Sequence, residues 1–89
     1  MAIEYDPQKD ARNREIRGLS FELVNDFRWE TAIVGRDDKR DYGEERFWAL
    51  GFIGEDLYTL VFTPRPKAIR VISLRKASRR ERLAYGETA

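Results

Sequence analysis

Residues 46–75 read RFWALGFIGEDLYTLVFTPRPKAIRVISLR and contain three apolar runs separated by two short turns. The runs are rich in β-branched and aromatic residues, which favour the pleated backbone of a sheet. They predict three strands, at residues 46–53, 57–63 and 68–75. Residues 54–56 make a tight hairpin, and the two prolines of residues 64–67 cannot continue a hydrogen-bonded ladder. Strands joined by such short connections predict an antiparallel meander.

The last of these strands should present alternate side chains to its two faces. Strict alternation sends four of them one way, namely Ile69, Val71, Ser73 and Arg75. It sends three the other way, namely Arg70, Ile72 and Leu74. Because both sets contain apolar residues, we expect both faces of the sheet to be partly covered.

A surface helix is predicted for residues 8–17. Asp6-Pro7 is a strong helix start, since Asp can cap free amides and Pro suits the first helical position, and Gly18 is the matching stop. Ala11 and Ile16 are the apolar residues between these signals, which predicts a narrow buried stripe.

Further elements surround the meander. Ser20 can cap a second, shorter helix whose apolar face is formed by Leu23, Val24 and Phe27. We expect a strand at residues 29–35, an exposed charged loop at 36–43, and a last short helix at 76–85 closed by Gly86. A short strand at residues 3–5 is left open. The predicted fold class is therefore α+β: an antiparallel β-sheet, two N-terminal helices on one face and a short C-terminal helix.

Length and composition bound the class of protein. With 89 residues and 42% hydrophobic types, the chain suffices for one core, so we treat residues 1–89 as a single domain. The lack of Cys and His excludes a disulfide framework and a zinc site built on thiolate or imidazole. The N-terminus lacks the pattern of a secretory signal, and no apolar run approaches the ~20 residues that cross a bilayer. We expect a cytoplasmic protein without membrane contact.

The net charge of +1 conceals a basic segment near the C-terminal end. Residues 65–82 hold eight Lys or Arg residues and one acid, Glu81, whereas acids outnumber bases in residues 1–64. Clustered cations gain free energy when they displace counterions from phosphates, so the segment is typical of a polyanion-binding surface. A solvated helix end and strand edge is the alternative reading of such a charge run.

Carboxylates in and after the charged loop are candidate metal ligands. They are Asp37, Asp38, Asp41, Glu44 and Glu45. Cations interrupt this cluster, which favours a solvated loop over a metal site. We therefore expect neither a metal nor a cofactor.

Arginines gather in the meander and the segment that follows it. Arg65 lies in a turn, Arg70 and Arg75 lie on a strand, and Arg82 lies near the end of the last helix. Guanidiniums on one side of a sheet can bind a phosphodiester bidentately and stabilise the extra charge of a pentavalent transition state. The pattern indicates phosphoryl chemistry by positioning, although any one of these arginines alone is more typical of a surface residue.

Short motifs also occur in a fixed order along nearly the whole chain. The N-terminal motifs are IEYDPQK at residues 3–9, Asn13, and GLSFE at residues 18–22. The C-terminal motifs are GEER at residues 43–46, VFTPR at 61–65 and IRVISLRKA at 69–77, followed by Glu81, Arg82 and Tyr85. Each motif is weak alone, but their order and spacing together resemble the BrnT family of ribonuclease toxins.

The resemblance implies a compact RelE-like fold and RNA cleavage that blocks translation. It also implies a BrnA-like ribbon-helix-helix antitoxin as partner. The pair would bind operator DNA only through this antitoxin. Carried over position by position, the functional residues fall on Lys9, Glu44, Glu45, Arg46, Arg65, Arg70, Ser73, Arg75 and Arg82. One departure matters. The family's Lys-His before the glycine is Ile16-Arg17 here, which favours a catalytically weak relative.

RNA cleavage of this kind requires a deprotonated 2′-hydroxyl, a stabilised phosphorane charge and a protonated 5′-oxygen. Without His, the base is open between two kinds of group. A carboxylate, Glu44 or Glu45, would need a pKa raised by burial, and a lysine, Lys9 or Lys76, would need a pKa lowered by neighbouring arginines. Tyr85 is a candidate acid. We expect arginine electrostatics to contribute most.

Three functions remain open at this point. The first is a metal-independent endoribonuclease toxin, and the second is a catalytically weak module that keeps the fold to bind RNA or its antitoxin. The third is a structural partner whose basic segment meets an acidic protein. An adjacent gene for a small ribbon-helix-helix protein would separate the first two from the third.

Overall fold

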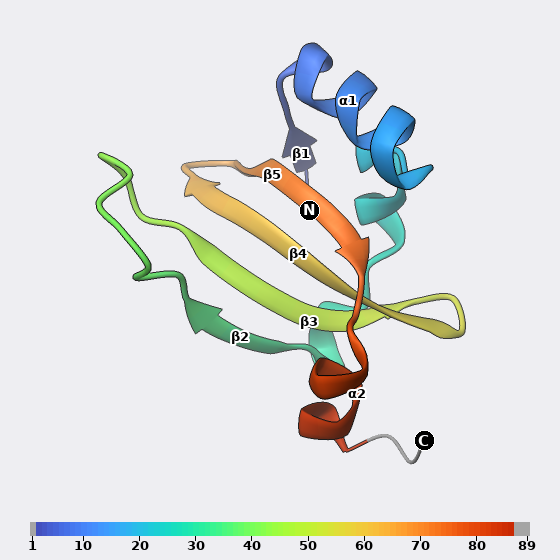
Figure 1. Ribbon diagram of the computed structural model, residues 1–89. Coiled ribbons are helices and arrows are strands. Elements are labelled where there is room, and N and C mark those ends of the chain that lie inside the picture. The colour runs from blue at the N-terminus through green and yellow to red at the C-terminus, as the bar shows by residue number, and fades with distance from the viewer. Residues whose placement is uncertain (1, 87–89) are drawn as a thin grey trace.

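The computed structural model describes residues 2–86 and confirms the α+β class (Figure 1). Five strands form one sheet in the order β1-β5-β4-β3-β2. They are β1 (Ala2–Glu4), β2 (Ile33–Arg36), β3 (Phe47–Ile53), β4 (Asp56–Arg65) and β5 (Ala68–Lys76). The helices are α1 (Pro7–Arg17), the 3-10 helices η1 (Phe21–Asp26) and η2 (Trp29–Thr31), and α2 (Arg79–Tyr85). Among these elements, no helix is long and apolar enough to span a bilayer.

The antiparallel meander is confirmed, but the sheet as a whole is mixed. Strands β2 to β5 pair antiparallel in chain order. Strand β1 instead pairs parallel with β5, with Ile3 opposite Ile69, so the prediction of an antiparallel sheet is wrong at this edge. The chain reaches β5 only after the whole meander, and no hairpin turn therefore imposes an antiparallel direction on β1.

A β-bulge interrupts the regular pairing of β4 with β5. Val61 lies opposite Ser73, and the next residue, Phe62, lies opposite Val71. Ile72 is therefore the extra residue of β5, with no partner on β4. A bulge of this kind shifts the alternation of side chains by one residue for the rest of the strand.

The bulge overturns the predicted faces of β5. Arg70, Ser73 and Arg75 lie opposite Thr63, Val61 and Thr59, respectively. These three β4 residues are spaced by two and share a face, so their three β5 partners share that face as well. Strict alternation had separated Arg70 from Ser73 and Arg75, and that expectation is wrong. Leu74, placed by the same argument beside Arg70, is instead fully buried in the core.

Helix α1 begins and ends as predicted but buries a different stripe. Asp6 caps its first turn, and Gly18 ends it with a left-handed φ of 71°. Its buried residues are Asp10 and Asn13, whereas Ile16 is 63% exposed. The expected apolar stripe is therefore wrong, because the helix is attached through polar side chains.

Hydrogen bonds from these two side chains fix α1 to the rest of the fold. The Asn13 amide donates to Leu19 O at 2.9 Å and to Leu74 O, on β5, at 3.0 Å. Asp10 Oδ1 accepts a hydrogen bond from the Phe21 amide at 2.7 Å. Helix α1 thus lies beside β5 (Figure 1), so the expectation that both N-terminal helices pack on one face of the sheet is wrong. Its Lys and Arg residues are exposed.

The second predicted helix is the 3-10 helix η1, not an α-helix. Ser20 caps it as expected. Phe21 and Val24 are its buried residues, and Phe27, directly after the helix, is buried as well. The three recur every three residues, which is the period of a 3-10 helix. Trp29 begins η2 and not a strand, so β2 starts later than predicted.

Two apolar clusters lie on opposite faces of the sheet. The larger one packs η1 on the sheet through Phe21, Val24, Phe27, Ala49, Tyr58, Leu60, Phe62, Ile69, Val71 and Leu74. The smaller one contains Leu50, Leu57 and Ala77, with Trp48, Phe52 and Tyr85 packed against it. Both faces are thus partly covered, as expected, one by η1 and the other at one end by α2 (Figure 1).

Candidate functional site

The sheet face opposite η1 carries four of the predicted functional residues, and we call it the basic face. Its members from β4 and β5 are Arg65, Arg70, Ser73 and Arg75. Arg65 shares this face because it follows Thr63 by two residues on β4. Without the bulge, Ser73 and Arg75 would point into the core under η1.

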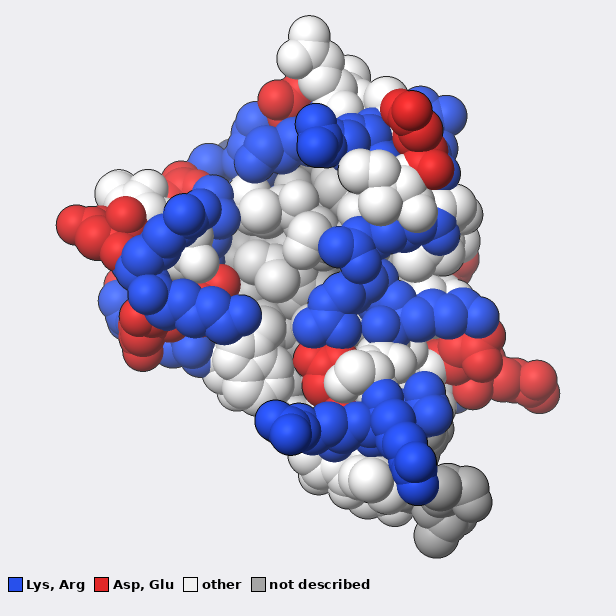
Figure 2. Space-filling view, viewed as in Figure 1, with Lys and Arg blue, Asp and Glu red and all other residues white. Residues whose placement is uncertain are grey.

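Basic side chains surround a hollow on this face. Figure 2 shows Lys and Arg over α1, β5, α2 and the loop between β2 and β3, around a central floor of uncharged residues. Most acidic side chains in this view lie at the outer margin, apart from a patch between β5 and α2. The arrangement attracts a polyanion and leaves the centre open to an uncharged group.

At one end of the basic face, Arg65 is held by two carboxylates. Its Nε lies 3.3 Å from Glu4 Oε1, and its Nη2 lies 3.5 Å from Glu44 Oε1. Glu44 Oε2 also accepts a hydrogen bond from Thr63 Oγ1 at 3.2 Å. Arg70, which lies opposite Thr63, forms no ion pair within the described part of the chain. This end therefore combines an anchored cation, a carboxylate and an available cation.

At the other end, Arg75 forms a bidentate ion pair with Glu81 of α2. The Nη1–Oε1 and Nη2–Oε2 distances are 2.7 and 2.8 Å. Glu81 also completes a capping box, because its Oε1 accepts from Ser78 N at 2.8 Å while Ser78 Oγ accepts from Glu81 N at 3.1 Å. This cap explains why α2 starts later than the predicted residue 76.

The ion pair fixes the protonation state of both groups. The hydrogen bonds from Arg75 lower the pKa of Glu81 from its ordinary value of 4.5 to about 2, although partial burial opposes the shift. The same hydrogen bonds raise the pKa of Arg75. Glu81 is therefore a permanent anion that orients Arg75, and it is unsuited to accept a proton during catalysis.

Glu45 and Arg46 belong to a separate cluster at the start of β3. Glu45 Oε1 lies 3.6 Å from Arg36 Nη1, which places this carboxylate with β2. The Arg46 guanidinium lies 4.0 Å from the centre of the Tyr42 ring, and its Nε is buried without a hydrogen-bond partner in the protein. The structure therefore does not bring Glu45 to the arginines of the basic face, and Arg46 stacks on the loop.

Lys9 and Arg82 border the basic face from the two α-helices. Lys9 lines a groove between α1 and β5 that also contains Ser73 and other basic side chains of α1. Arg82 Nη1 donates to Ala77 O at 3.3 Å, which holds its guanidinium against the start of α2. Both residues thus flank the arginines without lying in the sheet.

Two residues considered for proton transfer are engaged elsewhere. The Tyr85 hydroxyl donates to Thr31 O at 2.7 Å and so anchors α2 to η2. Lys76 lies opposite Tyr58, whose side chain belongs to the core under η1. Lys76 therefore faces away from the basic face. Because Glu45 also lies elsewhere, the candidates for proton transfer that remain near the basic face are Glu44 and Lys9.

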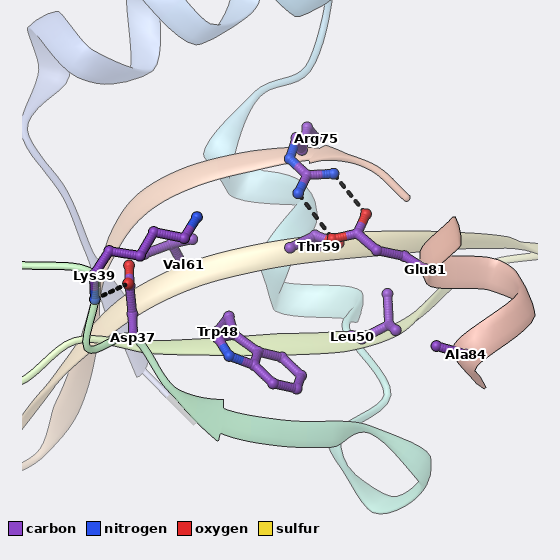
Figure 3. A pocket seen from close by; sticks show the side chains of 9 residues that line it. All are labelled: Asp37, Lys39, Trp48, Leu50, Thr59, Val61, Arg75, Glu81 and Ala84. Carbon is purple, nitrogen blue, oxygen red and sulfur yellow. Dashed lines mark hydrogen bonds and ion pairs between the residues drawn. The ribbon is translucent and has the colours of Figure 1, made fainter. Parts of the chain in front are cut away.

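A cavity of about 300 Å³ opens in the hollow (Figure 3). Its lining includes the apolar side chains of Trp48, Leu50 and Val61 and the charged ones of Lys39, Arg75 and Glu81. Strands β3 and β4 form the floor, α2 forms one wall, and the loop after β2 forms another. The cavity thus joins an apolar floor to a charged rim.

Sequence reasoning missed three residues of this site. The sequence placed Glu81 in a family motif and in the basic segment but gave it no functional role, and it placed Trp48 and Thr59 only in strands. Thr59 is buried below Glu81, close enough to lower its pKa although the hydroxyl lacks the geometry of a full hydrogen bond. The sequence does carry one signal, because Ser78 three residues before Glu81 is the pattern of a capping box. Nothing in the sequence pairs Glu81 with Arg75.

A family model covers most of the chain. The family is described as the ribonuclease toxin BrnT of type II toxin–antitoxin systems, and its model matches residues 5–81. The chain belongs to the BrnT family. The resemblance inferred from the motifs is thereby confirmed. Comparison with curated proteins gave no significant match.

Membership of the BrnT family indicates which substrate and which partner this chain is expected to have. The family is one of ribonuclease toxins in type II toxin–antitoxin systems, which implies RNA as substrate and an antitoxin as partner. The matched range includes every predicted site residue except Arg82. In this BrnT chain, three arginines of that range, Arg65, Arg70 and Arg75, lie together on the basic face of the sheet.

Proposed function

We propose that this BrnT toxin is an endoribonuclease that cleaves RNA on its basic face and so inhibits translation. The observation that carries the proposal is the bulge of β5, which sets Arg70, Ser73 and Arg75 on one face. We further propose a RelE-like architecture, because a small sheet with helices at its edges presents an open face to RNA. The site of action would be the cytoplasm, where translated RNA is found.

The proposed reaction is a transesterification within the RNA strand. The 2′-oxygen loses its proton and forms a bond to phosphorus, while the bond from phosphorus to the 5′-oxygen breaks and that oxygen takes up a proton. The products are a 2′,3′-cyclic phosphate and a 5′-hydroxyl end. The protein must hold the extra phosphorane charge and move two protons.

We assign the phosphorane charge to Arg70 first. Two carboxylates, Glu4 and Glu44, already pair with Arg65, whereas no carboxylate in the described chain pairs with Arg70. Ser73 lies on the same face and can donate a hydrogen bond to a phosphate oxygen. Charge stabilisation by oriented donors is commonly the largest single contribution to such a reaction.

Proton transfer is proposed for the two remaining candidates. Glu44 would accept the 2′ proton, because it is the one candidate carboxylate that lies near the arginines of the basic face. Lys9 would supply the proton to the 5′-oxygen from the groove it shares with Ser73. Arg82 would bind the RNA backbone from α2. These roles need no metal or cofactor, and we propose that none is used.

We propose that the antitoxin is a BrnA-like ribbon-helix-helix protein that covers the basic face and brings the pair to operator DNA. A concentrated basic surface attracts unwanted polyanions, and strand β2 is an edge with Ile33 43% and Val34 49% exposed. Co-expression with the product of an adjacent gene should give one complex at low salt. Separate elution of the two chains would contradict this partnership.

Two observations favour a second function, a catalytically weak module that binds RNA or antitoxin. Arg75 is already neutralised by Glu81, so it has less charge to offer a transition state. Arg17, at the position where the family motif has His, also removes one usual proton carrier.

Regulated expression in a bacterial host separates the two functions. We expect the wild type to arrest growth with early RNA fragmentation. A folded Arg70→Ala, Arg75→Ala double variant should permit growth and leave RNA intact, and Arg79→Ala, Arg80→Ala serves as the charge-matched control. Growth arrest by the double variant at the wild-type level would contradict catalysis and leave the binding module.

A further inference from the structure

Trp48 is held in one orientation at the floor of the cavity. It lies directly opposite Gly35 on the edge strand β2. A Cβ at Gly35 would overlap the Trp48 ring at its Cζ2 and Cε2 atoms, so the indole covers the bare backbone of the glycine. An aromatic ring across from an edge glycine is a known way to complete a sheet surface. The Trp48 ring is therefore preorganised, and it loses little side-chain entropy when a ligand binds against it.

The cavity beside this ring combines apolar and charged walls. Leu50 and Val61 extend the apolar floor, while Lys39 and Arg75 place positive charge at the rim (Figure 3). A volume of about 300 Å³ lies at the lower limit for small-molecule sites, roughly 300–1,000 Å³. The cavity therefore suits a flat group much smaller than a drug molecule, with an anion attached to it.

An acceptor with spare capacity stands at the same rim. Asp37 lines the cavity, and the contacts of its carboxylate are long, 3.3 Å from Lys39 N and 3.3 Å from Tyr42 Oη. Glu81, the other carboxylate there, is occupied by Arg75. A planar ligand with N–H groups on its edge would find in Asp37 the one lightly engaged anion among the described residues that line this cavity.

We propose that the cavity binds one unpaired nucleobase of the RNA, stacked on Trp48, with the adjoining phosphate at Lys39 and Arg75. This inference rests on the proposed function, because it names a subsite for the same substrate. Every base has a face for stacking, and aromatic platforms bordered by cations are the usual means of binding single strands. Guanine presents two adjacent N–H donors to a carboxylate, so Asp37 favours guanine over uracil.

An apolar side chain of a protein partner is the competing occupant. It would use the floor of the cavity but neither the cationic rim nor Asp37. The charge of the rim therefore favours the nucleotide, and binding experiments can separate the two occupants.

The test follows the indole N–H signal of Trp48 by ¹H–¹⁵N NMR in the full chain. Guanosine 5′-monophosphate, uridine 5′-monophosphate and ribose 5-phosphate are titrated in turn. We expect the guanine nucleotide to shift this signal and to bind at least about ten-fold more tightly than ribose 5-phosphate, with uridine 5′-monophosphate between them. Equal affinity of all three, or shifts confined to other residues, would overturn the proposal.

Two variants distinguish stacking from mere filling of space. Trp48→Phe retains an aromatic ring and should keep most of the affinity, whereas Trp48→Leu keeps an apolar floor and should lose about ten-fold. Both must melt as the wild type does, and if Trp48→Leu fails to fold, the comparison of Asp37→Asn with wild type replaces it. Loss of the guanine preference in Asp37→Asn is then the expected result, and an unchanged preference contradicts the proposal.

RNA cleavage separates failure of this subsite from failure of the proposed function. Cleavage of RNA by wild type and Trp48→Leu at equal rates and positions would overturn the subsite and leave the ribonuclease intact. Absence of cleavage by the wild type would overturn the function itself. If Trp48→Leu loses affinity for the antitoxin while its nucleotide binding is unchanged, the cavity belongs to the protein partner and the proposal is wrong.

Discussion

Arg75 on β5 and Glu81 on α2 form a bidentate ion pair, with N–O distances of 2.7 and 2.8 Å. Glu81 also caps the helix from which it comes, through Ser78. One carboxylate therefore joins the start of α2 to the sheet and fixes the direction of Arg75. The orientation of a cation on the basic face thus depends on a residue outside the sheet.

Low pH should weaken the ion pair between Arg75 and Glu81. The pKa of Glu81 is 4.5 in the unfolded chain, but the ion pair with Arg75 lowers it to about 2 in the folded chain. The contribution of the pair to stability is thus complete above pH 4.5 and is lost as the pH falls toward 2. Because the pair is partly exposed, we expect a loss of about 1 kcal/mol from the free energy of unfolding. Urea unfolding of wild type and Glu81→Gln at pH 6 and pH 3 measures it, and parallel pH dependences of the two proteins would refute it.

Glu81→Gln should also reduce catalysis at neutral pH. The amide cannot hold both guanidinium nitrogens as an anion does, so Arg75 loses its fixed orientation. We expect kcat to fall about ten-fold with little change in KM, since an oriented cation acts mainly on the transition state. Glu81→Asp, which retains the charge, should recover part of kcat. A rise in KM at constant kcat would show that Glu81 serves substrate binding instead.

Asn13 should be among the residues of α1 most sensitive to substitution. Its amide is buried and donates to Leu19 O and Leu74 O. Asn13→Ala leaves these carbonyls without their donor and should lower the free energy of unfolding by about 2–3 kcal/mol. Gln8→Ala, at an exposed position of the same helix, is the control and should change it by less than about 0.5 kcal/mol. Thermal melting of both variants checks the difference, and equal losses would contradict the assignment.

The sequence predicted the elements whose signals are local. The caps at Asp6 and Gly18, the meander and the covering of both sheet faces all follow from residue types within a few positions. The 3-10 helix also has a local signal, the three-residue spacing of Phe21, Val24 and Phe27, but Leu23 and Phe27 at a spacing of four suit an α-helix equally well.

The features that shape the site are not local, and the sequence could not reveal them. The bulge at Ile72 depends on how two strands align, and a stretch of alternating apolar residues looks the same with or without it. The pairing of Arg75 with Glu81 requires a turn between β5 and α2 whose direction no motif specifies. The parallel pairing of β1 depends on the same three-dimensional context.

Arg79 and Arg80 should affect RNA affinity more than rate. Both lie at the exposed start of α2, and neither belongs to the basic face of the sheet. Replacing each with Ala should reduce the slope of log Kd against log salt by about 0.7 for single-stranded RNA, with the single-turnover rate nearly unchanged. Filter binding between low and moderate salt measures the slope. A large fall in rate would instead place these residues in the reaction.

The rate of a single turnover by Arg70→Ala tests the ribonuclease account most directly. Measured with saturating enzyme on a short RNA, it reports the chemical step apart from binding. If Arg70 holds the phosphorane charge, the rate should fall by roughly 10²–10³-fold, as for a lost oxyanion donor, while Kd changes much less. Arg70→Lys should recover only part of the rate, because a lysine cannot bind two phosphate oxygens in the same fork. A folded Arg70→Ala protein that cleaves at the wild-type rate would contradict the account.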